Sequence, residues 1–175
     1  AYHRYHGVDT RMRRICNTEG RRMRVDDGLV IPAFMGQALR GEDLTVFGDG
    51  SQIRAFSYVD DSVVPFWNAS QNDECIGEII NLGGIKEYSI NDACNILINV
   101  TGLNIQPVYL EARHETRYAW STWDKSVKFL GFNHKVDLEE GLSKMWKWAQ
   151  KQPNRERFTW PKYELSKGIY EYWKN

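Results

Sequence analysis

A few polar side chains occupy positions where a folded chain could bind a charged or polar ligand. Asn17 ends the strand predicted over residues 10–17, and open α/β sheets bind their ligands at the carboxyl ends of strands. The alternative for Asn17 is an Asx turn that closes the strand. Arg54 begins the strand predicted after the tight turn 48–51, and Arg113 lies in a polar segment. A guanidinium fork matches two phosphate oxygens, so both arginines are candidates for a phosphate ligand, with a solvated surface charge as the alternative.

The cysteines and histidines predict no metal site. The cysteines are odd in number, widely spaced and without a Cys-x-x-Cys pair, which argues against a disulfide framework and favours buried thiols in a reducing compartment: Cys16, Cys75 and Cys94. The histidines have no metal-ligand spacing and are expected at the surface or at helix ends: His3, His6, His114 and His134.

The composition predicts a globular domain without a nucleic-acid or membrane partner. Hydrophobic residues make up 42% of the chain, and 23 basic residues balance 23 acidic ones. A net charge of zero gives no electrostatic case for binding nucleic acid or an anionic membrane surface. No apolar run approaches the ~18 residues of a membrane span, and nothing resembles a signal peptide. We therefore expect a cytoplasmic protein.

Strands alternate with helices in the predicted order, which indicates a single α/β or mixed α+β unit over residues 1–175. Ser89 is a good N-cap for one helix, and Gly102 ends it. The strand patterns cover residues 10–17, 44–47, 54–59, 78–82 and 105–110. The helical patterns cover residues 1–6, 32–40, 60–69, 90–100, 124–130 and 138–150.

The two ends differ from the rest of the chain. The chain opens without Met, in what resembles the last turn of a helix, and we interpret this start as a cut from a longer parent. After Pro153 the sequence is rich in aromatic residues, which we expect to cover the core rather than to form a sugar-stacking platform: Phe158, Trp160, Tyr163, Tyr170, Tyr172 and Trp173.

Several segments match the motifs of a known family in their order along the chain. Residues 17–23 (Asn-Thr-Glu-Gly-Arg-Arg-Met) are similar to an N-x-Y-G-P-R-M motif, and residues 27–32 to the D-G-R-V-V-P that follows it. The match continues through residues 37–41, 44–50, 51–61, 81–83, 130–132 and 138–142. Together these segments resemble the extended short-chain dehydrogenase/reductase family. Its closest branches are UDP-glucuronate decarboxylases, dTDP-glucose dehydratases and UDP-sugar 4-epimerases.

This resemblance implies a two-part parent enzyme that uses NAD. Its N-terminal Rossmann half carries a Gly-rich loop and a catalytic Tyr-x-x-x-Lys pair, and this sequence has neither in the right context. Tyr163 and Lys167 have the spacing of the pair, but they follow the Asn17 motif instead of preceding it. We therefore expect residues 1–175 to be the C-terminal half: the last Rossmann strands plus the mixed α/β substrate-binding domain. The NAD-binding half and every catalytic residue are expected to be absent.

The resemblance also implies the substrate contacts, with a UDP- or dTDP-sugar as the partner. The amide of Asn17 would contact the sugar nucleotide. Arg54 and Arg113 would clamp the diphosphate, with Arg117 as a rival for Arg113. Val30 and Thr45 would border the base, largely through backbone groups, although both also suit ordinary core or strand positions.

Contacts to NAD are implied for two residues, and three departures from the motif bear on them. Thr18 and Arg24 would lie near the cofactor, with a solvent-facing side chain as the alternative for Arg24. Glu19 and Arg21 stand where the family usually has Tyr and Pro, and Leu29 replaces a frequent Arg. A carboxylate at residue 19 would repel the cofactor phosphates or face solvent, so the departures weaken the expectation of tight NAD binding.

Two functions from different classes follow. The first is a part of an NAD-dependent epimerase or dehydratase that is inactive alone and that dimerises in its full-length parent. The second is a non-catalytic nucleotide-sugar binder or a degenerate remnant of a truncated gene. The sugar, the base and the choice among epimerisation, dehydration and decarboxylation are left open.

Overall fold

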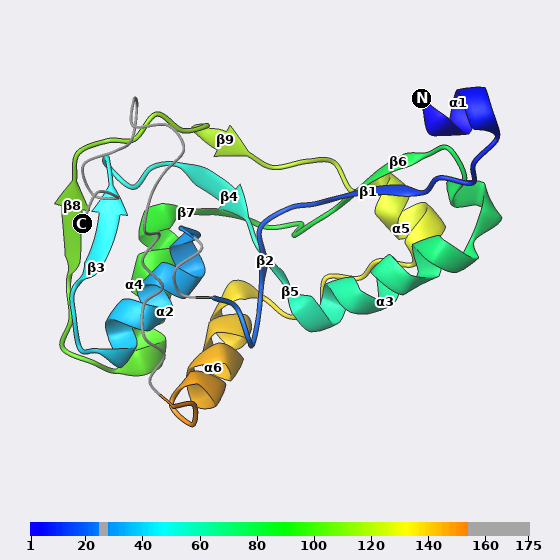
Figure 1. The fold of residues 1–175 in the computed structure, drawn as a ribbon. Coiled ribbons are helices and arrows are strands. Elements are labelled where there is room, and N and C mark those ends of the chain that lie inside the picture. The colour runs from blue at the N-terminus through cyan, green and yellow to red at the C-terminus, as the bar shows by residue number, and fades with distance from the viewer. Residues whose placement is uncertain (25–27, 154–175) are drawn as a thin grey trace.

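The computed structural model describes residues 1–24 and 28–153, which form a mixed α/β fold as predicted (Figure 1). Neither the aromatic tail nor the Tyr163 and Lys167 pair lies among these residues. In the described part, no helix is both long and apolar enough to cross a membrane. The helices are α1 Tyr2–His6, α2 Val30–Leu39, α3 Val59–Gln71, η1 Asp73–Cys75, α4 Ile90–Thr101, α5 Asp124–Leu130 and α6 Leu138–Ala149. The strands are β1 Met12–Ile15, β2 Thr18–Glu19, β3 Leu44–Phe47, β4 Ile53–Ala55, β5 Ser57–Tyr58, β6 Ile79–Leu82, β7 Glu87–Ser89, β8 Pro107–Leu110 and β9 Tyr118–Ala119.

One part of the molecule is built on the parallel pair β1–β6, in which Met12 pairs with Ile79 and Ile15 with Leu82. Helices α3 and α5 pack together beside this pair, and α1 lies at its far end (Figure 1). A small apolar core joins these elements: Ala69, Cys75, Ile80 and Leu130. This part corresponds to the predicted last strands of a larger parallel sheet.

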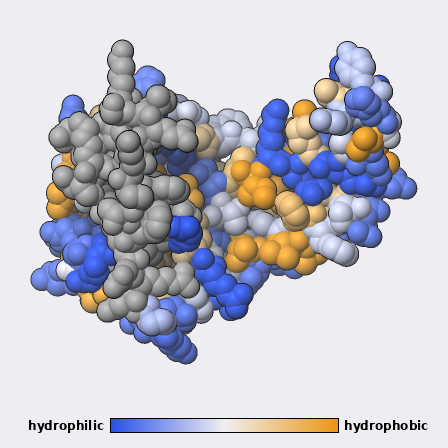
Figure 2. Space-filling model, in the orientation of Figure 1, coloured by the Kyte–Doolittle hydropathy of each residue, from blue (hydrophilic) through white to orange (hydrophobic). Residues whose placement is uncertain are grey.

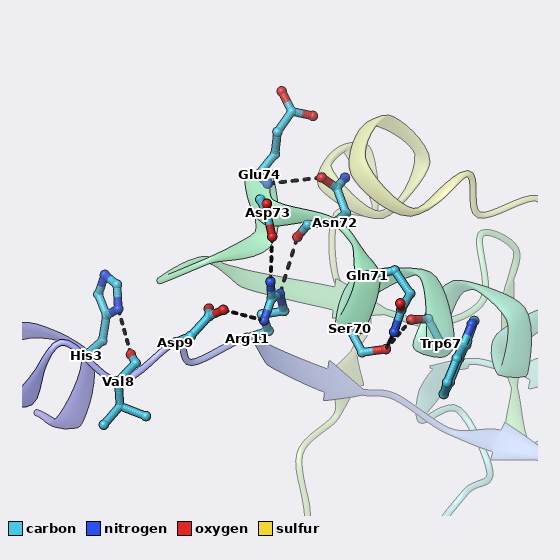
Figure 3. A network of polar contacts seen from close by, with 10 residues as sticks. All are labelled: His3, Val8, Asp9, Arg11, Trp67, Ser70, Gln71, Asn72, Asp73 and Glu74. Carbon is cyan, nitrogen blue, oxygen red and sulfur yellow. Dashed lines mark hydrogen bonds and ion pairs between the residues drawn. The ribbon is translucent and has the colours of Figure 1, made fainter.

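A polar network fixes the segment that leads into β1 against the end of α3 (Figure 3). Arg11 donates hydrogen bonds to the carboxylates of Asp9 and Asp73 at 2.8 and 2.9 Å, and to the carbonyl of Asn72 at 3.3 Å. The side chain of Asn72 accepts a hydrogen bond from the backbone N–H of Glu74 at 3.0 Å and so caps η1. Because Arg11 bonds both segments, it sets the direction in which the chain enters β1.

The larger core lies in the other part of the molecule, where α2, α4 and α6 pack together. Strands β3 and β8 form a parallel pair, while β4 lies between β7, which is antiparallel to it, and β9, which is parallel. Ser89 and Asp92 form a capping box at the start of α4, and Gly102 ends this helix in the left-handed conformation, as predicted. The largest fully buried side chains of this core include Phe34, Leu44, Tyr58, Leu97, Leu138 and Leu142.

The chain passes between the two parts in a way that differs from the prediction. The predicted strand 54–59 is divided at the buried residue Phe56 into β4 and β5. Gly84 packs on the Phe56 carbonyl so closely that a Cβ there would overlap it. The division lets β4 join the three-stranded sheet while β5 pairs with β2, a strand formed where the sequence indicated a turn.

Candidate functional site

Asn17 lies at the carboxyl ends of the parallel strands β1 and β6, as predicted from the sequence. Its φ of 28° departs from extended geometry and separates β1 from β2. The Asn17 carbonyl accepts a hydrogen bond from Ser57 N–H at 3.2 Å, so its backbone is tied to β5. Within the described residues, no hydrogen bond of the Asn17 amide closes an Asx turn. The Asn17 side chain is half-buried at the strand ends.

Three hydroxyl groups lie next to Asn17 and connect β2, β5 and α3. Thr18 Oγ1 lies 3.3 Å from Ser57 Oγ, and Ser62 Oγ donates to Ser57 Oγ at 3.4 Å. Ser57 and Ser62 are buried, whereas Thr18 is half-buried. Thr18 was predicted near the cofactor, while the two serines were not singled out. Their positions depend on the β2–β5 pairing, which the sequence pattern did not indicate.

Glu19 lies inside the protein, so the expectation that it faces solvent or the cofactor phosphates is wrong. Its side chain is 2% exposed, and its Oε1 packs on the backbone of Gly141 in α6. Burial, with a smaller contribution from the negative charge of Asp137, raises the pKa of Glu19 to about 8. The alternation of the short strand β2 explains this direction, because Thr18 and Glu19 point to opposite faces. Glu19 is therefore mostly protonated at neutral pH.

Arg54 is held in a defined position on β4. Its side chain is 12% exposed; Nη1 donates to the carbonyl of Ile53 at 2.8 Å, and Nη2 donates to Glu115 Oε2 at 2.9 Å. The other oxygen of Glu115 accepts a hydrogen bond from Gln52 Nε2 at 2.8 Å. Gln52 and Arg54 are two residues apart along extended chain and thus share one face. The surface-charge alternative for Arg54 does not fit a side chain this enclosed.

The segment between β8 and β9 carries the second predicted arginine. The Arg113 guanidinium carbon lies 3.2 Å from the centre of the Phe47 ring, a stacking contact at the end of β3. Arg117, its rival, donates to Ser51 Oγ at 3.4 Å in the turn before β4. Both arginines and Arg54 therefore surround the β3–β4 turn.

The residues predicted near the base lie on neighbouring elements. Gln37 of α2 binds Thr45 of β3 twice: Gln37 Nε2 donates to Thr45 Oγ1 at 2.8 Å, and Gln37 Oε1 accepts from Thr45 N–H at 3.2 Å. Val30 is the first residue of α2 and packs partly against the large core. Arg24 is exposed and precedes residues 25–27, which lie outside the described part.

The two groups of candidate residues are joined by one short run of chain. Arg54 lies on β4, and Ser57, which bonds the Asn17 backbone, lies three residues later on β5. Three residues of extended chain span roughly 10 Å. The strand ends at Asn17 and the arginine-rich turn at Arg54 are thus linked by a short run of chain, with amide and hydroxyl groups at one end and cationic groups at the other. No cluster of His, Cys, Asp or Glu that could hold a metal occurs among the described residues.

Known proteins resemble this chain in sequence. Residues 1–83 match the model of the NAD dependent epimerase/dehydratase family. The chain is 38% identical over 148 residues to UDP-glucuronic acid decarboxylase 1 of Xenopus tropicalis, a match covering 82% of this chain and 34% of the relative. It is 37% identical over 145 residues to UDP-glucuronic acid decarboxylase 5 of Arabidopsis thaliana, covering 82% of this chain and 42% of the relative.

Solved structures show the same likeness. The UDP-glucose 4-epimerase of Thermotoga maritima, solved with UDP-glucose, matches with a TM-score of 0.80 and 30% identity over 86% of this chain and 48% of the other. The UDP-glucuronic acid 4-epimerase of Bacillus cereus, solved with UDP-glucuronic acid and NAD, matches with a TM-score of 0.79 and 28% identity over the same shares. This chain thus spans less than half the length of each of these relatives. Sequence and fold together identify the chain as a relative of the NAD-dependent epimerase/dehydratase family.

Proposed function

We propose that this chain is the nucleotide-sugar-binding part of an NAD-dependent sugar-nucleotide epimerase, dehydratase or decarboxylase. The observation that carries the proposal is the enclosed guanidinium of Arg54 on the same run of chain that bonds Asn17. A nucleotide sugar needs cations for its diphosphate and polar groups for its sugar. Arg54 and Arg113 would take the diphosphate, Asn17 the sugar, and Val30 and Thr45 would border a uracil or thymine base.

NAD fits the strand ends better than the sequence alone suggests. Thr18 presents a half-buried hydroxyl there, and Arg24 is an exposed cation nearby in the chain. The carboxyl group of Glu19 is buried and mostly protonated at neutral pH, so it places no negative charge against cofactor phosphates. In the whole enzyme, Thr18 and Arg24 would lie beside NAD, which would supply hydride-transfer chemistry for the sugar. The part played by this chain is to position the sugar nucleotide beside the cofactor.

We also infer that an NAD-binding half packs against the β1–β6 pair. In the described part, β1 has a strand neighbour on one edge only. Hydrophobic surface gathers around β1 and α3 (Figure 2), where Trp67 is 65% exposed. Other exposed apolar side chains there are Met12, Ile15, Val63, Val64 and Ile79. An unpaired strand edge beside apolar surface favours association. A homodimer of the full-length parent, a cytoplasmic location and the absence of a nucleic-acid partner stay predictions.

A direct test is a calorimetric titration of the 175-residue chain with UDP and with dTDP. Binding of either nucleotide supports the proposal, whereas a folded chain that binds neither at millimolar concentration contradicts it. Circular dichroism of the same sample establishes that the chain is folded.

The second candidate function, a binder without catalysis, rests on the same contacts, because none of them requires a Tyr-x-x-x-Lys pair. We expect no turnover by this polypeptide alone. Incubation with NAD and UDP-glucose or UDP-glucuronate should yield neither NADH nor a converted sugar, and steady conversion would refute the assignment. In-frame fusion to an NAD-binding half that restores turnover would favour the enzyme over the binder.

A further inference from the structure

Residues 111–117 form a strap that crosses the β3–β4 turn. The strap is anchored at both ends, because β8 before it pairs with β3 and β9 after it pairs with β4. Between these strands no residue is buried; Arg113 stacks on the Phe47 ring, and Glu115 and Arg117 make polar contacts with the β3–β4 turn and β4. Moving its middle would expose little of the core.

Glu115 makes the central contact of the strap. One carboxylate oxygen accepts from Gln52 Nε2 at 2.8 Å and the other from Arg54 Nη2 at 2.9 Å. Glu115 is 36% exposed at its side chain, whereas Arg54 is 12% exposed. A carboxylate and a phosphate are bound by the same guanidinium donors and at similar distances. Glu115 thus occupies the position that a phosphate oxygen would take at Arg54.

We propose that Glu115 is an internal competitor for the diphosphate, and that the ligand takes its place on Gln52 and Arg54. This inference rests on the proposed function, because it concerns the same phosphate site. When Glu115 moves away, a negative charge leaves the region of Arg54, Arg113 and Arg117, and the strap loses its hydrogen bonds to Gln52 and Arg54. Nucleotides that carry phosphate then displace Glu115, whereas nucleosides leave it in place.

If Glu115 competes with the diphosphate, replacing it should strengthen UDP binding. Glu115→Gln keeps the size of the side chain and removes its charge, so UDP should displace it more easily. An ion pair of this exposure contributes up to about 1 kcal/mol, which corresponds to roughly three- to fivefold in affinity. Calorimetry should therefore give a UDP dissociation constant three- to fivefold lower for Glu115→Gln, with uridine binding unchanged. Glu115→Ala should change UDP binding in the same direction.

Glu111→Gln is the matched control, since it removes one negative charge from the same strap at another exposed position. An equal gain in this control would mean that only the net charge matters, which overturns the proposal. Unchanged or weaker UDP binding by both Glu115 variants also overturns it, because Glu115 would then orient Arg54 for the ligand. If folded wild-type chain binds neither UDP nor dTDP, the proposed function fails, and the competition fails with it.

Discussion

Replacing the buried carboxyl group of Glu19 by an amide should change how the stability of the fold depends on pH. The pKa of Glu19 is about 8 in the folded chain, against an ordinary value of 4.5. The folded state therefore holds this proton more tightly than the unfolded state does. The stability contributed by the neutral group is complete below pH 4.5 and is lost as the pH rises toward 8.

The magnitude follows from this difference in pKa. Between the unfolded pKa of 4.5 and the folded pKa of about 8, each pH unit lowers the free energy of unfolding by about 1.4 kcal/mol. At pH 7 the wild type has therefore lost roughly 3 kcal/mol of stability. Glu19 is 2% exposed, and solvent screening does little to reduce this cost. A domain of this size is stabilised by roughly 5–15 kcal/mol, so the effect should be large.

Chemical denaturation at pH 5 and pH 8 measures the effect. Glu19→Gln should lie within about 1 kcal/mol of the wild type at pH 5 and exceed its free energy of unfolding by about 4 kcal/mol at pH 8. Glu139→Gln, at an exposed position in the first turn of α6, should keep the pH dependence of the wild type. If Glu19→Gln loses stability between pH 5 and pH 8 as steeply as the wild type, the buried position of Glu19 is wrong.

Two further predictions concern the packing that surrounds the site. Gly141→Ala should destabilise the fold by about 1–3 kcal/mol, because the new Cβ would overlap Glu19 Oε1. Thermal melting of this variant tests the prediction. The double variant with Glu19→Ala, in which the overlap is relieved, should recover stability relative to Gly141→Ala. Ser89→Ala should lower the free energy of unfolding by about 1 kcal/mol, because Asp92 N–H loses the Ser89 hydroxyl as its hydrogen-bond acceptor. The control Ser70→Ala, at an exposed position in the last turn of α3, should lower it less. Equal melting temperatures for Ser89→Ala and the wild type would contradict the capping role.

Features set by local chemistry were predictable from the sequence. Helix α4 has the predicted cap residues at both ends, and β3 has its predicted bounds. These features depend on hydrogen bonds and side-chain spacing within a few residues. The resemblance to a family further predicted that Asn17 and Arg54 take part in one site, which the short β4–β5 run makes feasible.

Features set by contacts between distant segments were not predictable in this way. The partner of Arg54 is Glu115, 61 residues later, and no local pattern links them. The direction of Glu19 depends on a two-residue strand and on the absence of a side chain at Gly141. The division of the predicted strand at Phe56 follows from its packing against Gly84, which is also distant in sequence.

The central claim is that Arg54 binds the diphosphate of a nucleotide ligand. Calorimetric titration of UDP and uridine into the wild type, Arg54→Ala and Arg54→Lys tests it most directly. A charged hydrogen bond contributes roughly 1.5–3 kcal/mol, so Arg54→Ala should weaken UDP binding about tenfold to a hundredfold and barely affect uridine. Arg54→Lys should recover part of the loss, since an ammonium keeps the charge without the fork. Equal UDP affinity in all three proteins would contradict the claim.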